Sequence, residues 1–251
     1  MKLFYTIIMR TEIPKIENMQ AKAARNSLIV AAFSAVLVVL PFYQGNPLSD
    51  LWGISFITLC SFFTSLIVAL MFQKRSKKMK SLLNQSMLLA AWDMDKEMKD
   101  IYVAEFRREI YSRNKMLLWV ITGFFVLFTV IFLFIVKDDW PVFLGIMGSA
   151  YLLIFVAAIS APPYYTSKNK RGDGHVLVGA KYIYINSYFH NWDFPLSGLS
   201  SIEPISKPFR GIELIYFFTV RRNVQTQEIR IPTPDFIDAE KLIAQIQAEN
   251  A

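Results

Sequence analysis

The chain has 251 residues, of which 54% are hydrophobic and only 19% are charged. Soluble globular domains usually carry about a quarter charged residues, so this composition argues against a water-exposed enzyme domain and against a disordered chain. One cysteine excludes an intrachain disulfide and any multi-cysteine metal site, and two histidines leave little for histidine-based metal binding. The net charge of +7 is compatible with nucleic acid or an anionic membrane surface, and the hydropathy favours the membrane over nucleic acid.

Four long stretches of the sequence contain no Asp, Glu, Lys, Arg or His. They cover residues 27–42, 51–72, 116–136 and 140–160. About twenty helical residues cross the roughly 30 Å hydrocarbon core of a bilayer, and we therefore predict a bundle of four transmembrane helices. We expect the first to be a retained helix and not a secretory signal, because a long polar segment precedes it and no small-residue cleavage site follows it.

The lysines and arginines alternate between the connecting segments, which predicts the orientation of the spans. Five precede the first stretch, residues 43–50 contain none, residues 73–115 contain eleven, and the third link contains Lys137 beside two aspartates. We therefore predict a multi-pass protein of the cell membrane, with both termini and the link 73–115 in the cytoplasm. Almost no chain remains on the outer side, which excludes a receptor with its own extracellular ligand domain.

The four stretches contain none of the ionisable residues that proton pumps and ion-coupled transporters place inside the membrane. A paired-carboxylate site, a Ser–His–Asp set or a phosphate-cradling glycine loop is also not visible. We therefore expect no enzymatic activity, no cofactor and no metal. Small residues at four-residue spacing, as at Ala31 and Ala35, suit helix packing within one subunit or a homo-oligomer.

Residues 73–115 are expected to form a helical hairpin that continues the second and third spans into the cytoplasm. Its first apolar stripe ends at Trp92, and Asp93 or Asp95 is a candidate cap for the following helix. Basic residues gather at the membrane exit of the second span: Lys74, Arg75, Lys77, Lys78 and Lys80. Near an anionic surface each is worth about 1 kcal/mol, so this run is a candidate lipid contact as well as a topology signal.

From about Ala161 the composition becomes that of a soluble domain with short strands. We predict extended segments at residues 164–165, 175–178, 182–187, 190–195, 202–205, 213–220 and 226–231. Thr233 and Pro234 are expected to begin a closing amphipathic helix. The predicted organisation is a transmembrane domain, residues 1–160, and a cytoplasmic β-rich domain, residues 161–251, with about seven strands and one helix. We expect His175 and His190 to be strand residues without a ligand role, and Trp192 to be a core anchor.

Three segments of this C-terminal domain resemble the bacterial pleckstrin-homology-like (PH-like) domain. They are Gly179-Ala-Lys-Tyr-Ile-Tyr-Ile-Asn, Trp192-Asp-Phe-Pro-Leu-Ser-Gly-Leu-Ser-Ser-Ile-Glu, and Ile229-Arg-Ile-Pro-Thr-Pro with the helix Ala239-Glu-Lys-Leu-Ile. The resemblance covers roughly residues 165–248. The whole layout is similar to bacterial and archaeal multipass membrane proteins of unassigned function that end in such a domain. The resemblance implies a fold and no chemistry by itself.

In eukaryotic relatives of this family, basic residues in the loop between the first two strands often bind phosphoinositides. Lys168, Lys170 and Arg171 stand at the corresponding place, so the resemblance makes them candidate head-group contacts. Positive-inside bias also accounts for cations so close to a span.

The leading hypothesis is a membrane adaptor or regulator that presents the PH-like domain to a protein or to lipid. The alternatives are a small transporter or channel component with a regulatory domain and, least favoured, an enzyme acting on lipid. Neither nucleic acid nor a cofactor is expected as a partner.

Overall fold

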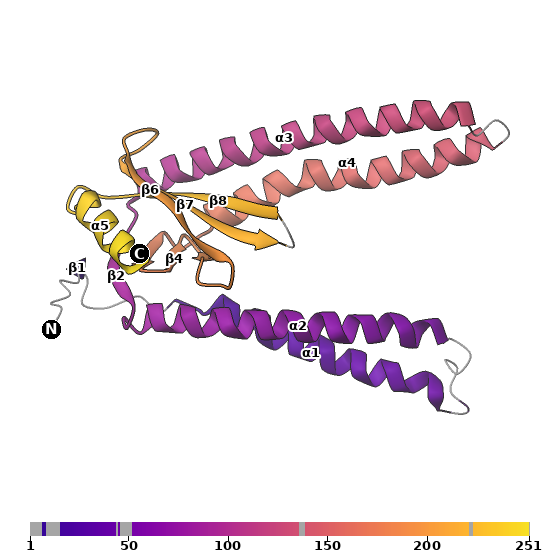
Figure 1. Ribbon diagram of the computed structural model, residues 1–251, viewed down its shortest axis with the longest axis horizontal. Helices are drawn as coiled ribbons and strands as arrows, with labels where there is room; N and C mark the ends of the chain where they lie inside the picture. Colours follow the sequence, from indigo (N-terminus) through magenta and orange to yellow (C-terminus); the bar gives the residue numbers. More distant parts are fainter. Residues whose placement is uncertain are drawn as a thin grey trace.

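The computed structural model describes residues 7–8, 16–43, 45, 52–135, 139–220 and 223–250. Within this part of the chain, long helices flank a β region made of two sheets (Figure 1). The long helices are α1 (Met19–Val39), α2 (Trp52–Leu83), α3 (Lys96–Ile135) and α4 (Trp140–Lys170). Each is long and apolar enough to cross a membrane, so the four predicted spans are confirmed by length and composition.

The long helices form two separate hairpins. Helix α1 packs along α2 and α3 packs along α4, and both hairpins extend in the same direction from the β region (Figure 1). Polar contacts join each pair, with 3.0 Å between the hydroxyls of Ser34 and Ser61 and 2.8 Å between those of Thr122 and Tyr151. Most other side chains of the hairpins are apolar and exposed, which suits a lipid environment. The short helix η1 (Leu40–Phe42) follows α1.

Several residues used to predict the orientation lie outside the described part of the chain. They are Lys2, Arg10, Lys15, Lys137 and Asp138, together with most of the link at residues 43–50. Of the other basic residues before the first span, Lys22 and Arg25 lie in α1.

The expected helical hairpin of residues 73–115 is wrong in its middle. Helix α2 ends at Leu83, and the next residues turn, with Gln85 at a φ of 62°, into strand β2 (Leu88–Asp93). This strand pairs antiparallel with β3 (His175–Gly179), about 85 residues further along the chain. Both faces of β2 are covered, and its residues are apolar on both faces. The periodicity of such a short apolar run does not distinguish a strand from a helix. The expected cap is confirmed at Asp95, whose Oδ1 accepts from Met98 N at 2.7 Å.

The expected extended piece at Tyr164–Tyr165 is also wrong, because α4 continues through it to Lys170. Pro162 and Pro163 lie inside this helix, where a proline removes one backbone donor. The carbonyl of Ala158, which an N–H at position 162 would normally reach, instead accepts from Asn114 Nδ2 of α3 at 2.8 Å. A side chain of the neighbouring helix therefore satisfies the carbonyl that Pro162 frees, which helps the helix to continue past this residue.

Within the described residues, seven antiparallel strands and the short parallel strand β1 form the two sheets. In the first sheet, β2, β3, β4 (Tyr182–Ile185) and β5 (Tyr188–Asn191) follow one another, and the two-residue β1 (Ile7–Ile8) pairs parallel with β2 at the edge. The second sheet contains β6 (Ser197–Ile205), β7 (Gly211–Val220) and β8 (Asn223–Pro232). Residues 161–251 supply six of the seven strands, and the seventh, β2, comes from the segment between α2 and α3.

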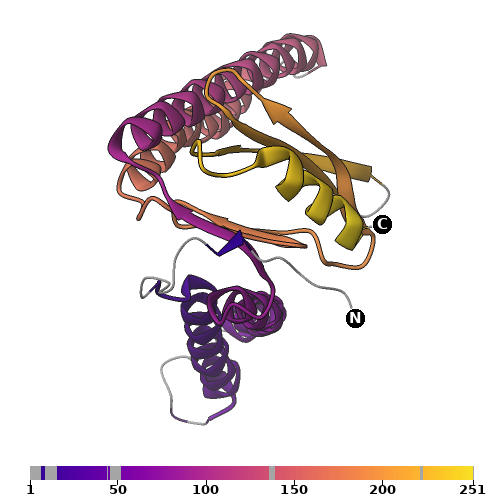
Figure 2. The same ribbon diagram turned by 90° about the vertical axis from the view of Figure 1, so that its left-hand side faces the viewer.

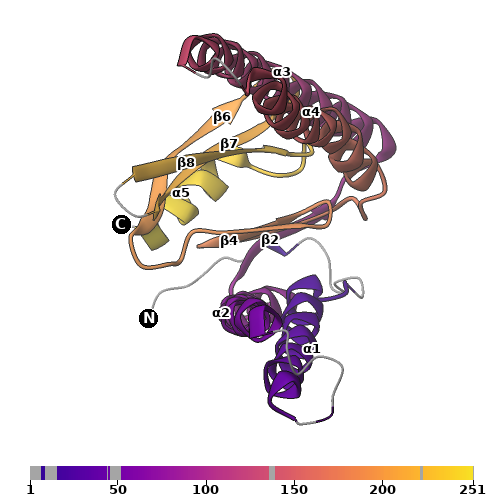
Figure 3. The same ribbon diagram turned by 90° about the vertical axis from the view of Figure 1, so that its right-hand side faces the viewer.

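The first sheet is buried on both faces. Alternate residues such as Leu177 and Tyr184 face a cluster that contains Met79 and Leu82 of α2. Their neighbours Val176 and Ile183 face the main core, which lies between the two sheets. Figures 2 and 3 show the resulting order of layers: α1–α2, the first sheet, the second sheet with α5 (Ala239–Asn250), and α3–α4.

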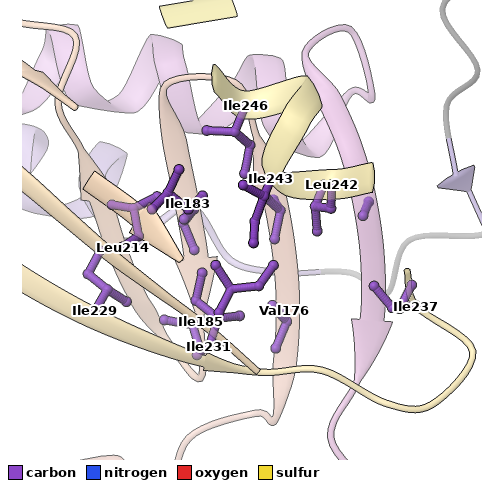
Figure 4. Close-up of a cluster of buried hydrophobic side chains, with 14 of the residues drawn as sticks. Val176, Ile183, Ile185, Leu214, Ile229, Ile231, Ile237, Leu242, Ile243 and Ile246 are labelled. Atoms are coloured by element: carbon purple, nitrogen blue, oxygen red, sulfur yellow. The ribbon is translucent and has the colours of Figure 1, made fainter. Parts of the chain in front are cut away.

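The closing helix begins later than expected. Thr233 is buried and its N–H donates to Arg210 O at 3.0 Å, whereas Asp238 Oδ1 accepts from Lys241 N at 3.1 Å and caps α5. The apolar side of α5, with Leu242, Ile243 and Ile246, points into the space between the sheets (Figure 4). Trp192 is 1% exposed in the same core, so its expected role as a core anchor is confirmed.

Candidate functional site

The predicted cations Lys168, Lys170 and Arg171 lie at the end of α4 and are exposed. Between them Asn169 is fully buried, and its carbonyl accepts from Asn186 Nδ2 at 2.7 Å. This bond fixes the last helical turn against the β4–β5 connection and turns the flanking lysines outward. Lysines in a last turn also interact favourably with the helix dipole.

Lys168 and Arg171 line a shallow depression of about 570 Å³, together with Tyr164, Ser167, Gly172 and Ser187. Its far wall is the two-residue turn between β4 and β5, in which Asn186 and Ser187 both have positive φ, at 48° and 72°. That backbone is favoured in two-residue hairpins because its twist matches the strands. Gly172 is required beside the turn, since a Cβ there would lie 2.2 Å from Asn186 Oδ1.

The donors around this depression suit a phosphate group. A guanidinium, an ammonium and hydroxyls are combined, and charge-assisted hydrogen bonds of this kind are the strong ones. Lys168 Nζ lies 5.2 Å from the centre of the Tyr188 ring. The nearby Asp173 is already engaged, because the Tyr184 hydroxyl donates to its carboxylate. Burial and, as a smaller cause, this contact with Asp173 raise the pKa of Tyr184. The phenol therefore stays protonated and keeps donating to the carboxylate.

Lys170 does not line the depression, although it is next to Arg171 in the chain and two residues from Lys168. The structure therefore divides this predicted trio into two lining residues and one that is only exposed.

The basic run of α2 is divided in a similar way. Arg75 Nη2 donates to Phe189 O at 2.8 Å and Arg75 Nε to Gln20 at 3.0 Å. Lys78 forms an ion pair with Asp193 at 2.6 Å and lies over the Phe194 ring. Both side chains thus hold α2 against β5 and the loop that follows it. The other three members of the run are exposed: Lys74, Lys77 and Lys80.

Sequence reasoning missed an ionic network that joins α3 to the second sheet. Arg230 of β8 contacts Glu105 of α3 at 3.0 Å, Glu213 of β7 at 2.9 Å and Glu228 at 2.5 Å. Glu105 also pairs with Arg108 at 2.7 Å. The available signal is the cross-strand pairing of opposite charges at Glu213 and Arg230, which the sequence allows once the β7–β8 register is known.

His190 of β5 lies near this network and lines a cavity of about 210 Å³ between α3 and the second sheet. Burial, together with the charge of Arg75, lowers the pKa of His190 to about 4. His190 is therefore neutral at pH 7. His175 of β3 contacts Asp93 of β2 at 2.6 Å, which adds a side-chain link across that strand pair.

Comparison of the chain with protein-family models, with curated proteins and with solved structures found no match. The fold alone therefore defines the class. By helix length and composition, it is a multi-pass membrane protein whose two membrane hairpins share one two-sheet β domain. Within the described residues, no group of three or more His, Cys, Asp or Glu residues has the arrangement of a metal site.

Proposed function

We propose that this chain is an integral membrane adaptor that holds a PH-like domain at the cytoplasmic face and binds the phosphate of an anionic head group there. The depression between the end of α4 and the β4–β5 turn carries the proposal. It combines Lys168 and Arg171 with the hydroxyls of Ser167 and Ser187.

The arrangement of strands supports the PH-like assignment. Four antiparallel strands, β2–β5, pack against three, β6–β8, and α5 closes the space between the sheets. The first of these strands is separated from the second by the whole α3–α4 hairpin. The loop between first and second strands, which the resemblance associates with head-group binding, is thus the membrane hairpin itself, and Lys168 and Arg171 stand where it returns to the sheet.

The level of the depression supports lipid as the ligand. Tyr164 and Lys168 follow the end of the uncharged stretch at Ser160 by four and eight residues, or about 6 and 12 Å along a helix. A head-group layer extends about 5–7 Å from each side of the hydrocarbon core. The ammonium of Lys168, on its long flexible side chain, therefore reaches the phosphate level.

The distribution of charge supports a cytoplasmic domain. Exposed cations gather where the hairpins meet the β domain, including Lys74, Lys77, Lys168 and Arg171. Positive-inside bias assigns this end to the cytoplasm.

The test uses the full chain, because a fragment of residues 161–251 lacks β2. Delipidated protein in detergent is titrated with phosphatidylglycerol, and bound lipid is counted by native mass spectrometry. We expect the variant Lys168→Gln/Arg171→Gln to lose bound phosphatidylglycerol. Lys168→Gln and Arg171→Gln are also tested singly, and Lys170→Gln is the matched control for each, since it removes one positive charge from the same turn without touching the depression.

Equal lipid binding by the double variant and the wild type would contradict the head-group site. Phosphatidylcholine serves as the lipid without net charge, and inorganic phosphate as a competitor separates recognition of phosphate from recognition of an acyl chain. If no anionic lipid binds, a protein partner becomes the better explanation of the depression, and crosslinking in the intact membrane identifies it.

A further inference from the structure

Exposed large apolar side chains are rare between β3 and α5. Among the described residues of 171–250 they are Leu196, Val224 and Phe236, at 73%, 65% and 55% exposure. Leu196 and Val224 lie on either side of Thr219 at the same end of the second sheet, because Leu196 O accepts from Thr219 N at 3.0 Å and Thr219 is the strand partner of Val224. Phe236 follows the other end of β8, about 30 Å away along a ten-residue strand.

The conformation of Leu196 is unusual for its residue type. Its φ is 61°, in the left-handed region where glycine or asparagine is favoured over leucine. An exposed leucine gains nothing in water that offsets this backbone cost. A residue held in such a conformation is a reason to look for a function of its side chain.

The position of this loop relative to the membrane follows from α2. Lys78 contacts Asp193 and Phe194, which come just before Leu196 in the chain. Lys78 is six residues past Phe72, the last residue of the uncharged stretch, or about 9 Å along the helix. The loop is thus at the edge of the head-group layer, which is about 5–7 Å deep.

The orientation of the second sheet supports the same location for this loop. The end of β7 and the start of β8 are directed toward the side on which both hairpins extend, and they lie between the hairpins (Figure 1). The level of the loop and the direction of the sheet therefore agree.

We propose that Leu196 and Val224 insert into the interfacial region of the bilayer and form a third membrane contact between the two hairpins. Apolar side chains at such a level are stabilised by transfer from water into the interface. The contact fixes the tilt of the β domain over the membrane. The inference rests on the proposed location of the domain at the membrane and is independent of ligand binding at Lys168 and Arg171.

The test places spin labels on the full chain in lipid nanodiscs. In a Cys60→Ser background, single cysteines are introduced by Leu196→Cys, Val224→Cys and Phe236→Cys and labelled. Labels at 196 and 224 are expected to be accessible to oxygen and protected from a water-soluble nickel chelate. The label at 236 is the matched control, exposed and apolar but at the far end of β8, and is expected to be open to the chelate.

Chelate accessibility at 196 and 224 equal to that at 236 would overturn the proposal. A second measurement avoids the label. Hydrogen exchange of residues 193–197 should be slower in nanodiscs than in detergent for the wild type, and Leu196→Asn/Val224→Ser should remove that difference. A difference that persists in this variant would also count against insertion. Loss of lipid binding in Lys168→Gln/Arg171→Gln leaves both readouts unchanged, so failure of one proposal is distinguishable from failure of the other.

Discussion

The two membrane hairpins are attached to the β domain by different means. Hairpin α1–α2 contacts the outer face of the first sheet through apolar residues and through Arg75 and Lys78. Hairpin α3–α4 is inserted between β2 and β3 and is joined to the second sheet through Arg230 and Glu105. A hairpin packed on a surface can shift without unfolding the domain, whereas an inserted hairpin shares its backbone with the sheet. The first sheet is attached to both hairpins, so movement of one hairpin relative to the other must be transmitted by this sheet.

The largest effect is expected at Trp92, where β2 enters the main core. Trp92 is 3% exposed and its Nε1 donates to Pro232 O at 3.1 Å. Trp92→Ala should lower the free energy of unfolding by about 3–5 kcal/mol. Hydrogen exchange across β3 and β8 measures the loss. Trp119→Ala, at a site 69% exposed on α3, is the control. Unchanged protection of β3 in Trp92→Ala would mean that β2 is not part of the domain.

The next effect concerns pH and His190, which lies in the cavity between α3 and the second sheet. Its pKa is lowered to about 4 by burial, and an unfolded histidine titrates near 6.5. The unfolded state therefore binds the proton first as pH falls. The contribution of His190 to the free energy of unfolding should be fully present above about pH 6.5. It should fall as the pH is lowered toward 4, by up to about 3 kcal/mol.

His190→Gln should flatten this part of the stability–pH curve, measured as unfolding temperature between pH 7 and pH 4. Equal slopes for the variant and the wild type would show that His190 is not held neutral by the fold.

A smaller effect is expected from the ionic network that joins the inserted hairpin. Arg230→Met removes the β8 partner of Glu105, whose side chain is only 10% exposed, and should cost about 1–3 kcal/mol. Adding Glu105→Gln should recover part of the lost stability, because the double variant no longer buries a Glu105 carboxylate without its Arg230 partner. The control is Arg210→Met, whose partner Asp235 is 99% exposed and whose loss should cost less than about 1 kcal/mol. Additive effects of the two network changes would argue against coupling.

The smallest effect is expected where the first hairpin packs on the sheet. Arg75→Gln removes the hydrogen bond to Phe189 O and should cost about 1 kcal/mol. Lys74→Gln removes an equal charge from an exposed neighbour and should leave stability unchanged. Limited proteolysis at the α2–β2 connection reports the difference. Equal behaviour of the two variants would indicate that α2 is held by its apolar contacts alone.

Local sequence patterns predicted the elements that depend on local signals. Uncharged stretches identified the four spans, and the extended segment predicted at residues 182–187 contains the core strand β4 (Tyr182–Ile185). The elements that were missed depend on distant partners. Strand β2 exists because β3 pairs with it, and α4 passes Pro162 because Asn114 of another helix supplies a donor.

The candidate site shows the same division. The sequence identified the cations at the ends of α2 and α4 as groups. Only the fold separates Arg75 and Lys78, which bind backbone and side chains of the β domain, from Lys168 and Arg171, which line a depression. The contact of Arg230 with Glu105 could not be predicted, because the two residues lie 125 positions apart in the chain.

The central claim is that two hairpins hold one shared domain at the cytoplasmic membrane surface, and cysteine accessibility tests it most directly. In a Cys60→Ser background, Tyr43→Cys and Asp139→Cys mark the far ends of the hairpins, and Ser187→Cys marks the β domain. A membrane-impermeant maleimide should label positions 43 and 139 in intact cells, and position 187 only after the membrane is opened. Labelling of position 187 in intact cells, or protection of either hairpin end, would contradict the account.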